Sequence, residues 1–357
     1  MSVIMKPSIN GPLLLVAICA FLPGALALEW QPHVHYKQFF PKWDALLKRV
    51  IREHCSDKLS KYLEAQGPLR HPSNSLVHCI LDVLDEPRKL EIAASSVILG
   101  LAPAVLQFFS LTTTDIAFLS FRRPLLATML AACSPCVNAL KALEYEQAIH
   151  SMSQPIGLSP RPGFLARRQN WVMWLVAAIQ YLVAAAAVAN VGLLAWQLAT
   201  WSIIVYVEQD FLLPPIWVVT PLLIHLLGAW ALRLRISVDH YDSKGRRTGS
   251  LCRRMWRTEA RPAAFDKELL WFREKPIGYC SVVVGWLVHM AMVVQLVFGT
   301  SILSGVIFIG FEDSILIIAR LAMSSIACRL IMQYETLGMR SLYRFRAQGG
   351  QHGSGPI

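Results

Sequence analysis

The strongest constraint on this chain is a series of apolar runs, each near the length that a helix needs to cross a lipid bilayer. A spanning helix takes about 20 residues. The candidate runs are residues 92–118, 171–199, 214–232, 279–310 and 314–333. Charged residues make up only 16% of the 357-residue chain, against about 25% in typical soluble proteins. The sequence therefore predicts an all-α fold: a polytopic transmembrane helical bundle, residues 92–340, with about five spans.

Basic residues at the ends of the runs indicate how the spans are oriented. The first run ends before Arg122 and the third ends on Arg233, as spans do at a cytoplasmic face. The loop 233–278 carries twelve basic and six acidic residues. If residues 125–140 do not cross, every loop obeys the positive-inside rule, and we expect this loop and the C-terminus in the cytosol. If they do cross, all later loops invert.

The first 27 residues have the pattern of a secretory signal peptide. Lys6 precedes an apolar run at residues 12–22, and Ala25 and Ala27 form a small-x-small cleavage site. The run is shorter than the roughly 20 residues of a span, so we expect cleavage before Leu28. An uncleaved anchor is the alternative. Both place the following residues outside the cytosol.

Residues 28–91 have the composition of a soluble domain, with ten basic and nine acidic residues. Apolar residues at helical spacing behind Pro41 predict an amphipathic helix, and a second is expected near residues 76–84. Cys55 and Cys79 are the cysteines of this small extracytoplasmic helical domain. In an oxidising compartment they could form a disulfide, and two separate buried thiols are the alternative. No ligand spacing indicates a metal site.

The stretch CSPC separates Cys133 from Cys136 by two residues. This spacing supports thiol-disulfide exchange when a thiolate is stabilised at a helix N-terminus after a thioredoxin-like strand, and neither condition is visible here. Pro124 can start a helix that Pro135 would end after at most about 24 Å, which is too short for a comfortable crossing. We expect a re-entrant or interfacial segment. A redox role is the alternative, favoured if the topology is inverted.

Several spans place a polar side chain at similar depth, counted at about 1.5 Å per residue from the expected cytoplasmic ends. This layer consists of Asp115, Gln180, His225 and His289, with Arg329 at its lower edge and Gln295 and Arg320 deeper in the bilayer. Ionisable groups within a span cost roughly 2.5–3.5 kcal/mol on insertion scales, so they should face the bundle interior. They could form a path or site for a proton, an anion or a small polar solute. The alternative is that they bond neighbouring helices and specify packing.

Short segments spread over roughly residues 77–340 also carry a family likeness. They are LGLAP (99–103), RRPLL (122–126), IQYLVAAAAVANV (179–191), ALRLR (231–235), VFGT (297–300) and LGMR (337–340). The chain resembles, in these segments, a group of uncharacterised polytopic integral membrane proteins of filamentous fungi. The resemblance implies a membrane fold. It transfers no catalytic or ligand-binding residue, because no activity is established for that group.

The sequence predicts no enzyme and no cofactor, because it contains no nucleotide-binding loop, nucleophile elbow or zinc-protease motif. Its basic residues lie between apolar runs without a nucleic-acid-binding motif. We expect an organising or accessory component of a secretory-pathway membrane, such as the endoplasmic reticulum, plasma membrane or vacuole, with the bilayer and other membrane proteins as partners. A transporter-like protein for a small polar solute is the first alternative, and a membrane thiol oxidoreductase using Cys133 and Cys136 is the second. The tail, 341–357, is expected to be disordered.

Overall fold

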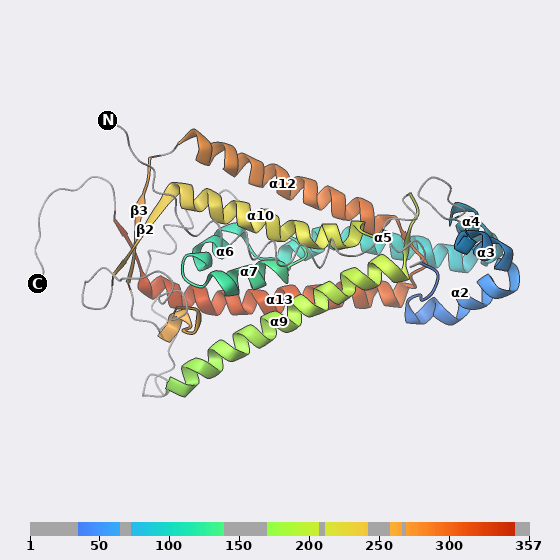
Figure 1. Ribbon diagram of the computed structural model, residues 1–357, viewed down its shortest axis with the longest axis horizontal. Coiled ribbons are helices and arrows are strands. Elements are labelled where there is room, and N and C mark those ends of the chain that lie inside the picture. Colours follow the sequence, from blue (N-terminus) through green and yellow to red (C-terminus); the bar gives the residue numbers. More distant parts are fainter. Residues whose placement is uncertain are drawn as a thin grey trace, which may run out of the picture.

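The computed structural model describes residues 35–64, 73–138, 170–206, 211–241, 258–265, 269–276 and 278–346. In these ranges the chain forms a bundle of long helices with a small helical domain at one end (Figure 1). Five helices are long and apolar enough to cross a membrane. They are α5 (Glu86–Phe109), α9 (Asn170–Trp201), α10 (Leu213–Arg235), α12 (Tyr279–Ser304) and α13 (Phe311–Leu342). The all-α, five-span bundle predicted from the apolar runs is confirmed.

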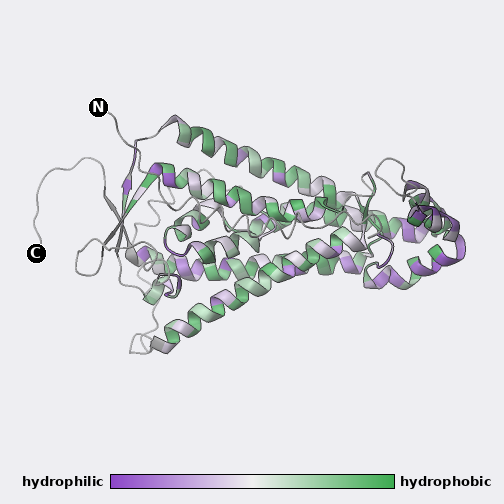
Figure 2. Ribbon diagram, in the orientation of Figure 1, coloured by the Kyte–Doolittle hydropathy of each residue, from purple (hydrophilic) through white to green (hydrophobic). Residues whose placement is uncertain are grey.

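The outer surface of the bundle is apolar. Figure 2 shows hydrophobic residues along the long helices and hydrophilic residues concentrated in the small domain. Large side chains such as Leu182, Val294 and Met323 are more than half exposed on the spans. A continuous apolar surface of this extent is stable in contact with hydrocarbon and not with water. The protein is therefore an integral membrane protein.

The bundle has two distinct ends. We call one the domain end, because the small domain lies there: α2 (Pro41–His54), α3 (Ser56–Glu64) and α4 (Ser73–Val83). We call the other the sheet end, because three strands meet there (Figure 1): β2 (Ile236–Tyr241), β3 (Leu269–Glu274) and β5 (Tyr343–Arg346). β3 pairs antiparallel with β2 and parallel with β5. α5, α10 and α13 run from the domain end toward the sheet end, and α9 and α12 run back.

The first span differs from the continuous run expected at 92–118. α5 begins at Glu86, inside the segment assigned to the N-terminal domain, and ends at Phe109. After a break, α6 (Thr113–Ser120) continues toward the sheet end, and the backbone N–H of Asp115 donates to Oγ1 of Thr112 at 3.1 Å. Threonine hydroxyls compete with helical hydrogen bonds and favour N-caps, so the threonines at 112–114 restart the helix here.

Residues 124–138 turn back into the bundle. α7 (Pro124–Ala132) has nine residues, or about 13 Å, which is too short to cross. The following residues to Asn138 are not helical but are fully buried in protein, and the backbone N–H of Asn138 donates to the carbonyl of Leu111 at 3.1 Å. Irregular backbone at membrane depth requires such burial. In its described part, the segment therefore has the short form expected for residues 125–140.

α12 is one continuous helix from Tyr279 to Ser304, within the apolar run 279–310. Gly299 lies on the face of α12 that contacts α10, where a side chain has no room. A Cβ at this position would clash with the indole ring of Trp217 on α10. The absent side chain lets α10 and α12 approach closely, as small residues do between membrane helices.

The small domain is tied by a disulfide between Cys55, at the α2–α3 junction, and Cys79 of α4, with 6.1 Å between the two Cα atoms. Its core is made by Trp43, Leu47 and Ile80, all fully buried. The domain shares this core with the ends of the spans, since Phe308 belongs to the same cluster.

Polar contacts and a short strand pair also close the domain end of the bundle. The backbone N–H of Lys42 donates to Oδ2 of Asp313 at 3.1 Å, and Nε1 of Trp43 donates to Oε1 of Glu91 at 3.3 Å. β1 (Ile203–Ile204) pairs antiparallel with β4 (Val306–Ile307). The domain is therefore fixed to the bundle. The expected signal peptide and residues 347–357 of the expected tail lie outside the described residues.

Candidate functional site

One face of α13 carries a line of polar side chains through the bundle. Arg320, Ser324, Cys328 and Glu335 are spaced by four, four and seven residues, so they lie along the same face of the helix. This face contacts α9 and the segment that ends α7. Because polar groups within a membrane are costly, the partners of each side chain determine what this site can do.

At the sheet end, Glu335 forms an ion pair with Arg123, and both side chains are 0% exposed. Nη1 of Arg123 lies 2.8 Å from Oε1 of Glu335. Gln180 of α9 bonds both members: its Oε1 accepts from Arg123 at 2.6 Å, and its Nε2 donates to Glu335 at 2.8 Å. The other carboxylate oxygen of Glu335 accepts from the backbone N–H of Ala263 at 3.1 Å. A buried pair is stable only with such additional hydrogen bonds.

Glu259 covers this ion pair from the loop at the sheet end. Its Oε1 accepts from the backbone N–H of Leu125 at 2.6 Å, its Oε2 accepts from the hydroxyl of Tyr181, and its carbonyl accepts from Nε of Arg123 at 3.1 Å. Burial raises the pKa of the Glu259 carboxyl, while the hydrogen bonds from Tyr181 and Leu125 act in the opposite direction. The segment 258–265 is thereby held against α7, α9 and α13.

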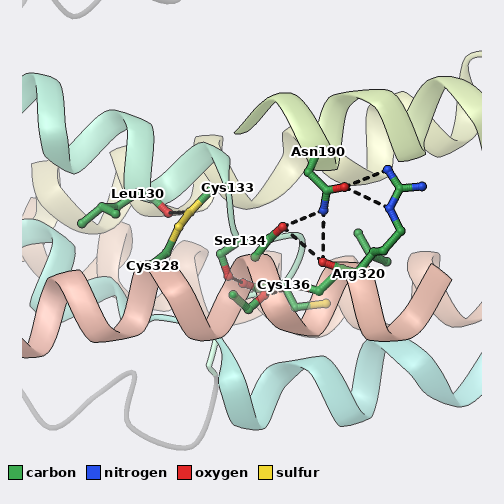
Figure 3. The surroundings of a disulfide bond; sticks show 10 residues. Leu130, Cys133, Ser134, Cys136, Asn190, Arg320 and Cys328 are labelled. Atoms are coloured by element: carbon green, nitrogen blue, oxygen red, sulfur yellow. Dashed lines mark hydrogen bonds between the residues drawn. A yellow bond between two sulfur atoms is a disulfide. The ribbon is translucent and has the colours of Figure 1, made fainter. Parts of the chain in front are cut away.

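Toward the domain end, Arg320 of α13 bonds two amides of α9, and Figure 3 shows the one at Asn190. Its Nε and Nη2 donate to Oδ1 of Asn190 at 3.0 and 2.8 Å, and its Nη1 donates to Oε1 of Gln197 at 3.2 Å. Nδ2 of Asn190 donates in turn to Oγ of Ser324 at 2.8 Å. Among the described residues, no carboxylate forms an ion pair with Arg320. Its charge is held by neutral groups.

Between these two polar groups, a disulfide joins Cys133 at the end of α7 to Cys328 of α13, with 6.9 Å between their Cα atoms (Figure 3). Cys136 is a free thiol and is fully buried, as is the Cys133 sulfur. Reactive thiols lie in accessible, electropositive surroundings. The CSPC pair has no such access, and it does not form an internal disulfide, because Cys133 is bonded to Cys328.

The predicted polar layer is divided among different contacts. Gln180 belongs to the ion pair at the sheet end, whereas His225 of α10 is fully buried and neither ring nitrogen has a hydrogen-bond partner among the described residues. Asp115 lies in the first turn of α6, and His289 is half-buried on α12. The guanidinium of Arg329 donates to the carbonyl of Phe108. Gln180 and His225, which the sequence placed at similar depth, therefore do not share a hydrogen-bonded site in the described structure.

Further polar atoms without partners lie near the helix break. Within the described residues these are Oγ1 of Thr113, Oγ1 of Thr114 and Oε1 of Gln295. Thr113 packs against α10, since a Cβ on Gly228 would lie 2.9 Å from the Thr113 Cβ, and His225 is one turn away on the same helix. Gln295 donates its amide to the carbonyl of Pro135 at 2.9 Å. These atoms, like Nε1 of Trp217 and Nε2 of Gln107, have unused hydrogen-bonding capacity within the described residues.

Sequence reasoning missed the main partners in this site. Arg123 follows the first apolar run and Glu335 follows the last, which ends at residue 333, so hydropathy selects neither as a residue of the bundle interior. Asn190 was passed over inside an apolar helix. The available signal was Asn190, which interrupts the apolar run 171–199 and is costly there unless a partner exists.

The site therefore contains the buried ion pair of Arg123 and Glu335, the carboxyl group of Glu259 beside it, the Cys133–Cys328 disulfide, and the Arg320 cation bonded to two amides. Comparisons of the chain with protein-family models, with curated proteins and with solved structures find no match. The functional argument consequently rests on these contacts.

Proposed function

We propose that the protein is a non-catalytic organising or accessory component of a membrane. The observation that supports this proposal is the set of hydrogen bonds among Arg123, Gln180 and Glu335. Apart from Nη2 of Arg123, which has no partner among the described residues, their polar side-chain atoms bond one another and the segment 258–265. These bonds fix α7, α9, α13 and the sheet-end loop in one arrangement. Polar side chains that bond one another between membrane helices specify how the helices pack.

The same contacts argue against catalysis. A catalytic site needs a nucleophile, acid or base that can reach a substrate. Glu335 has both carboxylate oxygens bonded, and the sulfurs of Cys133 and Cys136 are buried. This disfavours the thiol oxidoreductase alternative.

The orientation that fits this function places the domain end outside the cytosol and the sheet end in the cytosol. Support comes from the Cys55–Cys79 disulfide, which is typical of an oxidising compartment, and from the net positive loop 233–278, whose described strands β2 and β3 lie at the sheet end. The proposed location is accordingly a membrane of the secretory pathway.

Native gel electrophoresis tests the organising function. Extracted from its own membrane with a mild detergent, the 40.0 kDa chain should migrate within a larger assembly, and cross-linking in the intact membrane should give the same partners. A chain that migrates alone, with no cross-linked partner, contradicts the proposal.

Transport of a small polar solute is the second candidate, and the unpartnered ring nitrogens of His225 favour it. Together with Thr113 and Gln295 they could bind water or a solute near the broken first span, since discontinuous helices form the sites of many transporters. Proton or solute flux in reconstituted vesicles that disappears in His225→Leu and persists in His289→Leu would replace the organising function with this one.

A further inference from the structure

Arg320 carries a charge that no acidic side chain among the described residues neutralises. A guanidinium has five N–H donors, and the hydrogen bonds to Asn190 and Gln197 use three of them. The side chain is only half-buried, and the described residues supply no carboxylate within ion-pair distance. Within the described part of the chain, two N–H groups and the positive charge of Arg320 have no partner, so they can bind a further group.

The charge lies within the hydrocarbon region. Arg320 is nine residues after Phe311, or about 14 Å along α13, and Gln197 is four residues before Trp201, or about 6 Å along α9. Helical side chains lean toward the helix N-terminus, so the guanidinium is directed toward the domain end. At this depth an unneutralised cation is costly, and a carboxylate supplied by a partner removes much of that cost.

The surface beside Arg320 has the composition of a helix-binding face. On α9 it consists of Ala186 and Leu193, and on α13 of Leu316, Ala319 and Met323; we call these residues together with Arg320 the Arg320 face. Leu193, Leu316 and Met323 are 57%, 59% and 65% exposed, and both alanines are exposed. Small residues beside a polar group allow close approach of membrane helices and a hydrogen bond between them.

We propose that the Arg320 face binds a transmembrane helix of a partner protein that carries an Asp or Glu at the depth of Arg320. The inference rests on the organising function and names the chemistry of its partner. A carboxylate matches the fork of free N–H groups on the guanidinium. An adjacent apolar helix would cover the three exposed large side chains of the face.

Among the described residues, a second copy of the chain offers no free carboxylate at this depth, and Glu312 at the start of α13 is paired with Lys42. α9, α10 and α12 contain no acidic residue. Near the domain end of the other spans, Glu91 is bonded to Trp43 and to the backbone of Phe311, and Asp313 to the backbone of Lys42. A lipid phosphate would have to leave the headgroup layer to reach this depth.

Synthetic transmembrane peptides provide the test. The full-length protein, with a donor dye at its C-terminus, is reconstituted in phosphatidylcholine vesicles with acceptor-labelled leucine–alanine helices that carry one Glu, Gln or Lys at the depth of Arg320. Energy transfer should show the Glu peptide binding about tenfold more tightly than the Gln peptide. Arg320→Met should remove this preference. Arg329→Met, a matched arginine on the same helix, should retain it, and Arg320→Glu should prefer the Lys peptide.

Three results would overturn the inference. They are equal binding of the Glu and Gln peptides to the unchanged protein, retention of the preference in Arg320→Met, and displacement of the Glu peptide by phosphatidylglycerol, which would assign the face to anionic lipid. Retention of the Cys133–Cys328 disulfide on non-reducing gels checks that each variant has folded. If peptide selectivity is absent while the protein still migrates in a larger native assembly, this inference fails and the organising function stands.

Discussion

Gln180 on α9 and Glu335 on α13 are joined by a 2.8 Å hydrogen bond inside the bundle, although 155 positions separate them in the chain. Further along the same pair of helices, Asn190 is joined to Ser324 at 2.8 Å. Asn190 lies ten residues after Gln180 on α9, and Ser324 lies eleven residues before Glu335 on α13. The two contacts therefore fix the antiparallel register of these spans, and a one-residue slip would break both.

Removing one member of the buried ion pair should be strongly destabilising. We expect Glu335→Leu to lower the free energy of unfolding by ~3–5 kcal/mol, because it removes the closest counter-ion of the buried Arg123 and leaves only the more distant carboxylate of Glu259, at 3.9 Å. The double variant Arg123→Leu with Glu335→Leu should lose less than the sum of the two single changes. Reversible unfolding in mixed detergent micelles measures all three. Additive losses would show that the pair is not coupled.

The disulfide of the small domain should contribute roughly 3 kcal/mol, because Cys55 and Cys79 close a loop with a sequence separation of 24. Thermal unfolding of Cys55→Ser should show this loss, and reductant should reduce the stability of the unchanged protein in the same way. Peptide mass mapping that finds both thiols free would mean that apolar packing alone holds the helices together.

The position of Gly299 should tolerate no larger side chain. In Gly299→Val the added atoms meet the Trp217 indole, and we expect a loss of about 1–3 kcal/mol from overpacking as α10 and α12 separate. Gly192→Val is the matched control, because nothing lies within 4 Å of a Cβ added there. Equal losses in the two variants would indicate an effect of helix propensity and not of the α10–α12 contact.

Docking of the segment 258–265 should weaken as pH rises. The pKa of Glu259 is raised above its ordinary value of 4.5 in the docked state by burial. A raised pKa means that the docked state binds the proton more tightly, so its contribution is complete below 4.5 and is lost as pH rises through the docked-state pKa. Hydrogen exchange of the Ala263 amide should therefore show weaker protection, beyond its intrinsic pH dependence, above that pKa. Glu259→Gln should remove the effect, and an unchanged profile in this variant would assign it to another group.

The five spans could be predicted because length and hydropathy are local properties, and a lipid-facing helix must satisfy both. The break before Thr113 was harder to predict. Its residues, Ser110, Leu111 and Thr112, are uncharged and are tolerated within a spanning helix. Whether the helix breaks there depends on hydroxyl caps and on the bond of Asn138 to Leu111. Hydropathy does not record either contact.

The site was predictable as a set of costly residues but not as a set of partners. Gln180 and Arg320 could be selected because each is polar within an apolar run. The bond of Gln180 to Glu335, and that of Cys133 to Cys328, depend on how α9, α7 and α13 are placed side by side. Sequence spacing carries no information on that placement when the partners are more than a hundred positions apart.

The orientation of the bundle can be tested with cysteines near the sheet end. Cys280 is exposed at the start of α12, and Cys252 belongs to the basic loop, outside the described residues. If the sheet end faces the cytosol, a membrane-impermeant maleimide should label neither thiol in sealed cells or vesicles of native orientation, and both after the membrane is opened. Cys55 and Cys79 form a disulfide, so the maleimide should not label the small domain before or after the membrane is opened. The variants Cys252→Ser and Cys280→Ser assign the label to one position. Labelling of Cys252 before opening would show that the topology is the opposite one. The net positive loop would then face the oxidising side, against the positive-inside rule.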